Sequence, residues 1–187
     1  MPTEQNAEIL QALKESAAAL RDNGIEFALA GGLACWARGG PATEHDVDLV
    51  IREEDVERAL LALRKAGMRT DIPPEGWLAK AWHEGTLVDL IHSPMDVDIN
   101  DAFFARCDTL SVAAVMMPVM QLDDVLVSKL LALSEHNLDF APPLEWARAL
   151  REQISWSDVE TRTRRSPFAR TFFHLLEQLG VLETATS

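Results

Sequence analysis

The chain has 187 residues, enough for one domain with a sizeable hydrophobic core or for a core with a small appendage. Its net charge of −13 argues against broad binding to nucleic acid, which depends on many Lys and Arg contacts with phosphate, and favours a cationic small molecule or a basic protein surface. No stretch approaches the roughly 20 apolar residues that cross a bilayer, and the first residues lack a secretion signal. We therefore expect no membrane partner and a cytoplasmic location.

The predicted elements alternate between helices and strands up to about residue 92. Apolar residues at helical spacing predict an amphipathic helix over residues 4–22. The pattern then predicts, in order, a strand over 25–30, a short helix over 31–38, a strand over 46–51, a helix over 53–67, a strand over 68–72 and a hairpin of 77–82 with 86–91 around Glu84-Gly85. This order predicts an α+β (α/β) fold, in which a mixed β-sheet has helices packed on one face.

After about residue 100 the sequence becomes mainly helical. We expect a helix over 101–107, a strand over 109–114 and then a series of helices, the first of them capped by Asp123. The chain is therefore predicted to consist of a core, residues 1–115, and a C-terminal helical region, residues 116–187.

Two carboxylates open the strand predicted at 46–51. Successive strand residues alternate between faces, so Asp46 and Asp48 point the same way while Val47 and Leu49 point into the core. Two neighbouring carboxylates at the start of an apolar strand are costly unless a cation lies between them. A divalent metal that holds a phosphate fits this position, because Mg²⁺ is usually bound by one or two carboxylates together with substrate phosphate oxygens.

Two further features support a phosphate site at this strand. Gly31 and Gly32 open the short helix, and without side chains there a phosphate can approach the first backbone N–H groups of that helix. Asp89 lies within the apolar run Thr86–His92, where a carboxylate should be paired or liganded. Three carboxylates from two neighbouring strands would form one acidic cluster.

The Asp-x-Asp pattern occurs a second time, at Asp96-Val97-Asp98. There it follows Ser93-Pro94-Met95, and no strand with a glycine pair and helix precedes it. We interpret this second copy as a solvated loop. The pattern is weak by itself, and the glycine pair and Asp89 distinguish the first copy.

The ordered set Gly31-Gly32, Asp46-Val47-Asp48 and Asp89 resembles the nucleotidyltransferase fold of the DNA polymerase β superfamily. The small bacterial AbiEii/MNT-like nucleotidyltransferases are the most similar group. The resemblance covers about residues 25–92. It extends more loosely through residues 122–133, which are similar to the helix that carries an active-site lysine in relatives, here Lys129.

The resemblance implies an activity and a set of site residues. The enzyme would move an NMP from an NTP onto a hydroxyl acceptor and release pyrophosphate, with Mg²⁺ or Mn²⁺ as cofactor. Asp46, Asp48 and Asp89 would be the catalytic residues and the metal ligands. The nucleotide phosphates would be bound by Gly31, Gly32 and Lys129.

Two classes of function stay open at this point. One is the enzyme, whose acceptor would be a small molecule such as an aminoglycoside, a protein side chain or, less favoured by the charge, the end of a transfer RNA. The other is a non-catalytic nucleotide-binding protein, or an antitoxin-like regulatory partner of the same fold that acts through another protein. The complete set of carboxylates favours the enzyme.

Five other polar residues receive weaker interpretations. Lys80 and Arg38 are expected to be surface charges rather than phosphate ligands. Lys129 borders the apolar stripe of its helix, so a snorkelling lysine with its ammonium in water is the alternative to a phosphate ligand. His45 is expected to be structural, and Asp139 is the only nearby match to a downstream acid that some relatives carry.

Overall fold

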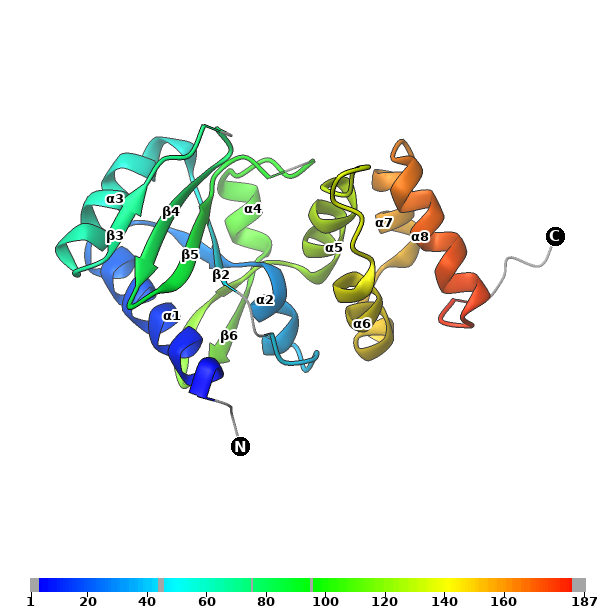
Figure 1. Ribbon diagram of the computed structural model, residues 1–187, viewed down its shortest axis with the longest axis horizontal. Coiled ribbons are helices and arrows are strands. Elements are labelled where there is room, and N and C mark those ends of the chain that lie inside the picture. The colour runs from blue at the N-terminus through cyan, green and yellow to red at the C-terminus, as the bar shows by residue number, and fades with distance from the viewer. Residues whose placement is uncertain (1–3, 44–45, 75, 95, 183–187) are drawn as a thin grey trace.

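The computed structural model describes residues 4–43, 46–74, 76–94 and 96–182 (Figure 1). The first part contains α1 (Glu4–Asp22), β1 (Phe27–Leu29), α2 (Gly31–Ala37), β2 (Val47–Ile51), the 3-10 turn η1 (Glu53–Asp55), α3 (Val56–Lys65), β3 (Arg69–Asp71), β4 (Leu78–His83), β5 (Thr86–Ile91) and α4 (Asp101–Arg106). There follow β6 (Asp108–Val112), β7 (Val115–Val119), α5 (Leu122–Leu131), α6 (Ala141–Ala149), the 3-10 turn η2 (Arg151–Gln153), α7 (Trp156–Thr163) and α8 (Pro167–Gln178). The predicted mixed fold with helices and strands is confirmed.

The described strands form one mixed sheet of seven strands in the order β3-β4-β5-β2-β1-β7-β6. Its central strands β2 and β5 run parallel, and each has an antiparallel neighbour on its other side. Helices α1 and α3 contact each other, with α1 also packing on β2 and β5 and α3 on β3 and β4. In β2, Val47 and Leu49 are fully buried and Asp48, between them, is half-buried. The apolar face of the central strands therefore forms the core, and the opposite face is free to carry polar side chains.

The strand β7 was missed in the sequence, and the strand predicted over 109–114 ends earlier than expected, at Val112. Ala113 and Ala114 turn the chain between β6 and β7 with φ values of 49° and 67°. Such turns usually carry Asn or Gly, which adopt positive φ readily. Pro118 also lies within the strand, where proline lacks the backbone N–H that a sheet uses. It is tolerated because β7 pairs with β1 only at its end, through Val119.

The helical region begins at Leu122, after β7 ends at Val119. The division of the chain into residues 1–115 and 116–187 stays a prediction. The cap predicted for α5 is wrong: Gln121 precedes the helix without a side-chain cap, and Asp123 lies in its first turn. Asp123 accepts a hydrogen bond from the backbone N–H of Ser155 (3.0 Å), which precedes α7, because the fold brings this donor to the carboxylate.

A buried carboxylate holds α5 against the rest of the molecule. The side chain of Asp124 is 4% exposed and forms ion pairs of 2.8 Å with Arg106 of α4 and Arg162 of α7. Arg162 also contacts Asp96 (3.6 Å), in the loop between β5 and α4. These contacts connect α4, α5, α7 and that loop, and so fix the helix that carries Lys129.

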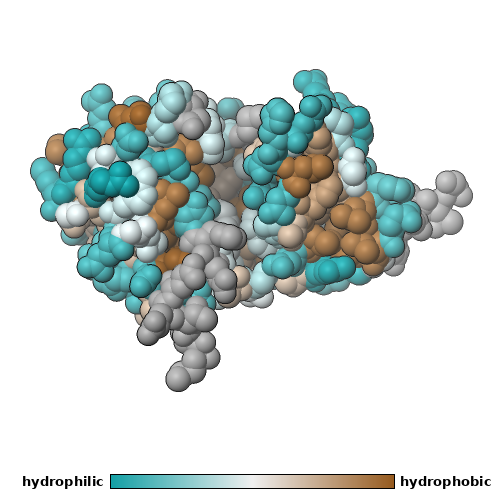
Figure 2. Space-filling view, in the orientation of Figure 1, coloured by the Kyte–Doolittle hydropathy of each residue, from teal (hydrophilic) through white to brown (hydrophobic). Residues whose placement is uncertain are grey.

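The molecule has two lobes, which we call the sheet lobe, up to β7, and the helical lobe, from α5 onwards (Figure 1). Figure 2 shows that hydrophilic residues cover much of the visible surface of the sheet lobe, while hydrophobic residues gather on the helical lobe. The helices α2 and α5 pack together between the lobes, and α2 also contacts β2. Within the described residues, none of the helices has both the length and the apolar composition that crossing a membrane requires.

Candidate active site

Three carboxylates meet on the polar face of the sheet. Asp48 of β2 and Asp89 of β5 are partners in the parallel register of these strands, and Asp46 lies just before β2. One carboxylate oxygen from each of the three lies within 4.8 Å of the others. The acidic cluster expected from two neighbouring strands is therefore present, and we call it the triad.

The burial of the neighbouring residues explains why the triad side chains point to this face. Val47 and Leu49 flank Asp48, and Val88 and Leu90 flank Asp89; all four apolar side chains are fully buried. A shift of one residue in the register would turn these side chains out of the core and the carboxylates into it. The hydrophobic core thus sets the direction of the carboxylates.

Lys80 belongs to the site, although it was expected to be a surface charge. Its register partner is Asp89, in the antiparallel pair of β4 and β5, and its Nζ donates to Asp89 Oδ1 at 3.0 Å. Asp89 is 8% exposed. The signal was present in the sequence, because a two-residue turn at Glu84-Gly85 pairs His83 with Thr86 and therefore residue 80 with residue 89.

Burial and mutual repulsion both disfavour the ionised forms of the triad carboxylates Asp48 and Asp89. The pKa of the Asp48 carboxyl is raised from 3.8 to about 8, mainly because burial disfavours its charged form, and also because Asp46 and Asp89 repel it. The positive charges of Lys129 on α5 and Lys80 on β4 lower the same pKa. Burial likewise raises the pKa of Asp89, against the opposing effect of Lys80. A divalent cation would relieve this repulsion.

The raised pKa of Asp48 makes the stability of the metal-free protein depend on pH. Between pH 3.8 and about 8 the folded protein retains a proton that the unfolded chain releases. The contribution of this proton to the free energy of unfolding is therefore complete below pH 3.8 and is lost as the pH rises through 8. Asp48→Asn has no such proton to lose. In EDTA, its melting temperature should therefore rise relative to that of the wild type between about pH 5 and about pH 9. A difference that stays constant over this range in differential scanning fluorimetry would contradict the assignment.

The glycine pair has a packing role that sequence reasoning missed. Gly31 has φ +57°, and a Cβ atom placed on it would lie 1.8 Å from Asp48 Oδ2. A Cβ on Gly32 would lie 2.8 Å from Thr43 Oγ1. The space beside each Cα is thus taken by a side chain of the loop or strand that follows α2. The absence of a side chain at Gly31 lets the Asp48 carboxylate lie against the start of that helix.

Arg38 and Asp139 lie outside the triad. Arg38 is not a surface charge: its side chain is 10% exposed, pairs with Asp108 at 2.8 Å and donates to two backbone carbonyls at the end of β7. Asp139 is exposed and accepts a hydrogen bond from the backbone N–H of Ala141 (3.0 Å), at the start of α6. His45 falls outside the described residues. None of these three is a described member of the cluster.

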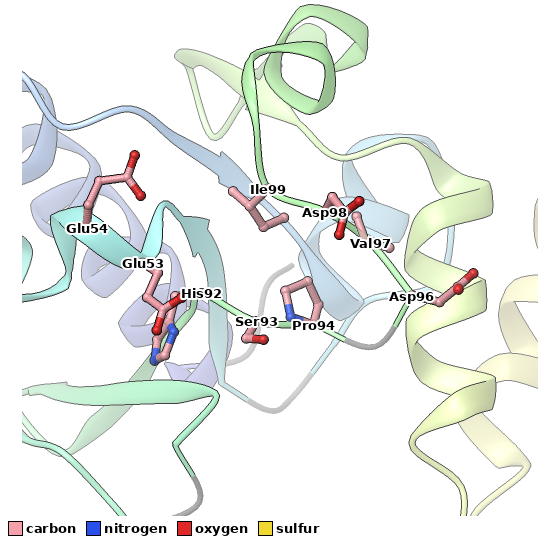
Figure 3. A pocket seen from close by; sticks show the side chains of 9 residues that line it. All are labelled: Glu53, Glu54, His92, Ser93, Pro94, Asp96, Val97, Asp98 and Ile99. Carbon is pink, nitrogen blue, oxygen red and sulfur yellow. The ribbon is translucent and has the colours of Figure 1, made fainter.

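A pocket of about 330 Å³ lies beside the loop that follows β5 (Figure 3). Its lining includes four carboxylates, those of Glu53, Glu54, Asp96 and Asp98, together with His92, and it includes no residue of the triad. Asp96 and Asp98 are exposed and lie outside helices and strands, which confirms the solvated loop predicted for the second Asp-x-Asp pattern. The four carboxylates add negative charge to the surface beside the loop that follows β5.

Several solved structures share this fold. The solution structure of the antibiotic-resistance factor ANT(2'')-Ia superimposes with a TM-score of 0.66 at 16% identity, over 91% of this chain and 96% of that one. Its crystal structure in complex with adenylyl-2''-tobramycin gives 0.65 at 13% identity, over 89% and 97%. The lincosamide antibiotic adenylyltransferase LnuA, bound to lincomycin, gives 0.50 at 13% identity, over 77% and 94%. At these identities the likeness concerns the fold.

The sequence itself identifies the family. No curated protein matches it significantly. The sequence model of the family NTP_transf_5, described as "Uncharacterised nucleotidyltransferase", matches residues 1–181, which include the triad, the glycine pair and Lys129. The fold shared with the two antibiotic-modifying proteins agrees with this match. The chain therefore belongs to this family of nucleotidyltransferases.

Proposed function

We propose that this protein is a metal-dependent nucleotidyltransferase that moves an NMP from an NTP onto a hydroxyl acceptor and releases pyrophosphate. The observation that carries the proposal is the convergence of Asp46, Asp48 and Asp89 within 4.8 Å in a chain of a nucleotidyltransferase family. Carboxylate oxygens are the donors that Mg²⁺ and Mn²⁺ prefer. The raised pKa of Asp48 supports the same conclusion, because burial and the charges of Asp46 and Asp89 disfavour its ionised form, which a divalent cation would stabilise.

Asp46, Asp48 and Asp89 would hold the metal. Bound divalent ions in such a site neutralise phosphate charge and stabilise the attacking and the leaving oxygen. Asp89 would also accept the proton of the acceptor hydroxyl. The hydroxyl oxygen would form a bond to the α-phosphorus of the NTP. The bond between this phosphorus and the bridging oxygen would break, and pyrophosphate would leave. The burial of Asp89 between the strands suits this role, since burial raises its pKa and makes the carboxylate a better base.

The nucleotide phosphates would lie between the glycine pair and α5. Gly31 and Gly32 open α2 beside Asp48, where backbone N–H groups at a helix start favour negative charge. Lys129 would supply a cation from the helical lobe, as its effect on Asp48 suggests. These three assignments are part of the proposal.

We propose a cationic small molecule as the acceptor. The net charge of −13 supports this choice, because it attracts cations to the protein. Two structures with a similar fold contain small molecules. ANT(2'')-Ia is in complex with adenylyl-2''-tobramycin, and LnuA is bound to lincomycin. The narrower assignment to the AbiEii/MNT-like group, and the cytoplasmic location, stay predictions from the sequence.

The test is a calorimetric titration of each NTP, with Mg²⁺, into three proteins. These are the wild type, the double variant Asp46→Ala/Asp48→Ala, and the double variant Asp22→Ala/Glu57→Ala as a control of equal charge. The control removes two exposed carboxylates, from α1 and α3, that lie outside the triad. We expect the wild type and the control to bind one NTP in a metal-dependent manner and the triad variant to bind none. A folded wild type that binds no NTP would favour the non-catalytic regulatory partner instead.

A further inference from the structure

Lys80, Asp89 and Asp48 form one row across three neighbouring strands. Asp89 is the register partner of Lys80 in β4–β5 and of Asp48 in β2–β5. Register partners project to the same face of a sheet, so an ammonium and two carboxylates lie side by side on the face of the triad. Asp71 of β3 is the partner of Lys80 on its other side, but it is exposed and its Oδ1 accepts from the backbone N–H of Ile72. Within the described part of the chain, Lys80 forms its ion pair with Asp89.

The pair is largely shielded from water. The side chain of Lys80 is 27% exposed and that of Asp89 is 11% exposed. The residues two positions away on the same face of β4 are Leu78, which is buried, and Trp82, which carries the guanidinium of Arg69 at 3.6 Å from its ring centroid. A lysine between such neighbours is confined more than a surface lysine, and its charge is screened less.

Two consequences follow for the triad. The χ2 torsion of an aspartate is broad, so a charge-assisted hydrogen bond to one oxygen limits the orientation of the whole carboxylate. A fixed positive charge beside the triad also competes with a second cation, because it offsets part of the negative charge that would attract one.

We infer that Lys80 is an internal counter-ion of the triad: it holds Asp89 through one carboxylate oxygen and lowers the affinity of the nucleotide-free protein for a divalent cation. The inference rests on the proposed function, in which the triad binds the metal. It means that the metal binds weakly alone and more tightly together with the nucleotide, whose phosphates add the missing ligands and charge. Lys80 is a positioning residue, since it acts through Asp89.

The experiment titrates Mn²⁺, without nucleotide, into the full-length wild type and three variants, Lys80→Met, Lys80→Gln and Lys80→Arg. Removing the charge should tighten Mn²⁺ binding by about tenfold in Lys80→Met and Lys80→Gln, the order expected for one unit charge near a partly buried site. Lys80→Arg keeps the charge and should bind like the wild type. A lysine with only a structural role would not produce tighter binding when it is removed.

Lys65→Met is the matched control, because it removes the same charge from an exposed position at the end of α3. It should leave Mn²⁺ binding unchanged. A parallel titration with Mn²⁺ and the NTP selected by the calorimetric test should show a gain of less than threefold for Lys80→Met, since nucleotide phosphates then dominate the binding.

The outcomes separate this inference from the proposed function. A wild type that binds Mn²⁺ and NTP, with Lys80→Met and Lys80→Gln unchanged or weaker for Mn²⁺ alone, would overturn the role of Lys80 and leave the proposed function in place. A folded wild type that binds Mn²⁺ neither alone nor with any NTP would overturn both. If Lys80→Met does not fold, Lys80→Gln provides the same comparison, because it retains a hydrogen-bond donor for Asp89.

Discussion

Asp89→Asn is expected to bind Mg²⁺ and NTP but to lose nucleotidyl transfer by about 10²–10⁴-fold, the range typical of a lost general base. Asparagine keeps the shape of the side chain, and its amide oxygen can still accept the hydrogen bond from Lys80. It cannot accept the proton of an acceptor hydroxyl, and it is a weaker ligand for a divalent ion. Pyrophosphate release in the presence of an acceptor that the wild type uses measures this loss.

Asp71→Asn is the control for this prediction. Asp71 is the register partner of Lys80 on the side opposite Asp89, but it is exposed and lies on the next strand away from the triad. Its replacement removes one negative charge on the same row of the sheet and should leave transfer within about twofold of the wild type. Retained transfer by a folded Asp89→Asn would show that Asp89 is not the base.

Gly31→Ala is expected to destroy metal-dependent NTP binding and to destabilise the fold. The φ of +57° is unfavourable for a residue with a side chain by about 1–2 kcal/mol. In addition, the new methyl group would overlap with Asp48, because its position lies 1.8 Å from Oδ2. The carboxylate or the start of α2 must then move. The first movement separates Asp48 from Asp46 and Asp89, and the second displaces the backbone N–H groups proposed to bind phosphate.

Gly24→Ala isolates the effect of the backbone. Gly24 has a similar φ, +63°, but a Cβ there would meet nothing within 4 Å. It should lower the melting temperature through strain alone and leave NTP binding unchanged. Thermal unfolding and the NTP titration of both variants distinguish the two effects. Gly31→Ala with NTP binding equal to that of Gly24→Ala would show that the contact between Gly31 and Asp48 is not needed for the site.

Lys80 shows how much local sequence patterns can predict about a site residue. The hairpin around Glu84-Gly85 was predicted correctly, and its two-residue turn already implies that residue 80 faces residue 89. Judged as a single charged residue on a strand, however, Lys80 resembled an exposed charge. Its burial depends on the strands beside it and on the carboxylate opposite, and those neighbours are defined only by the complete sheet.

The sequence by itself determined the order of the elements up to β5, the side of β2 on which Asp46 and Asp48 lie, and the candidate cluster with Asp89. These features depend on periodicity and strand alternation, which each segment carries in its own residues. The tertiary structure alone decided the turn at Ala113 and Ala114, the contact between Gly31 and Asp48, and the packing of α5, the helix of Lys129, against α2. Each of these depends on how segments distant in the chain pack together. Packing can impose an unfavourable φ on a residue, or bring a side chain next to a distant segment, and no local sequence pattern indicates either effect.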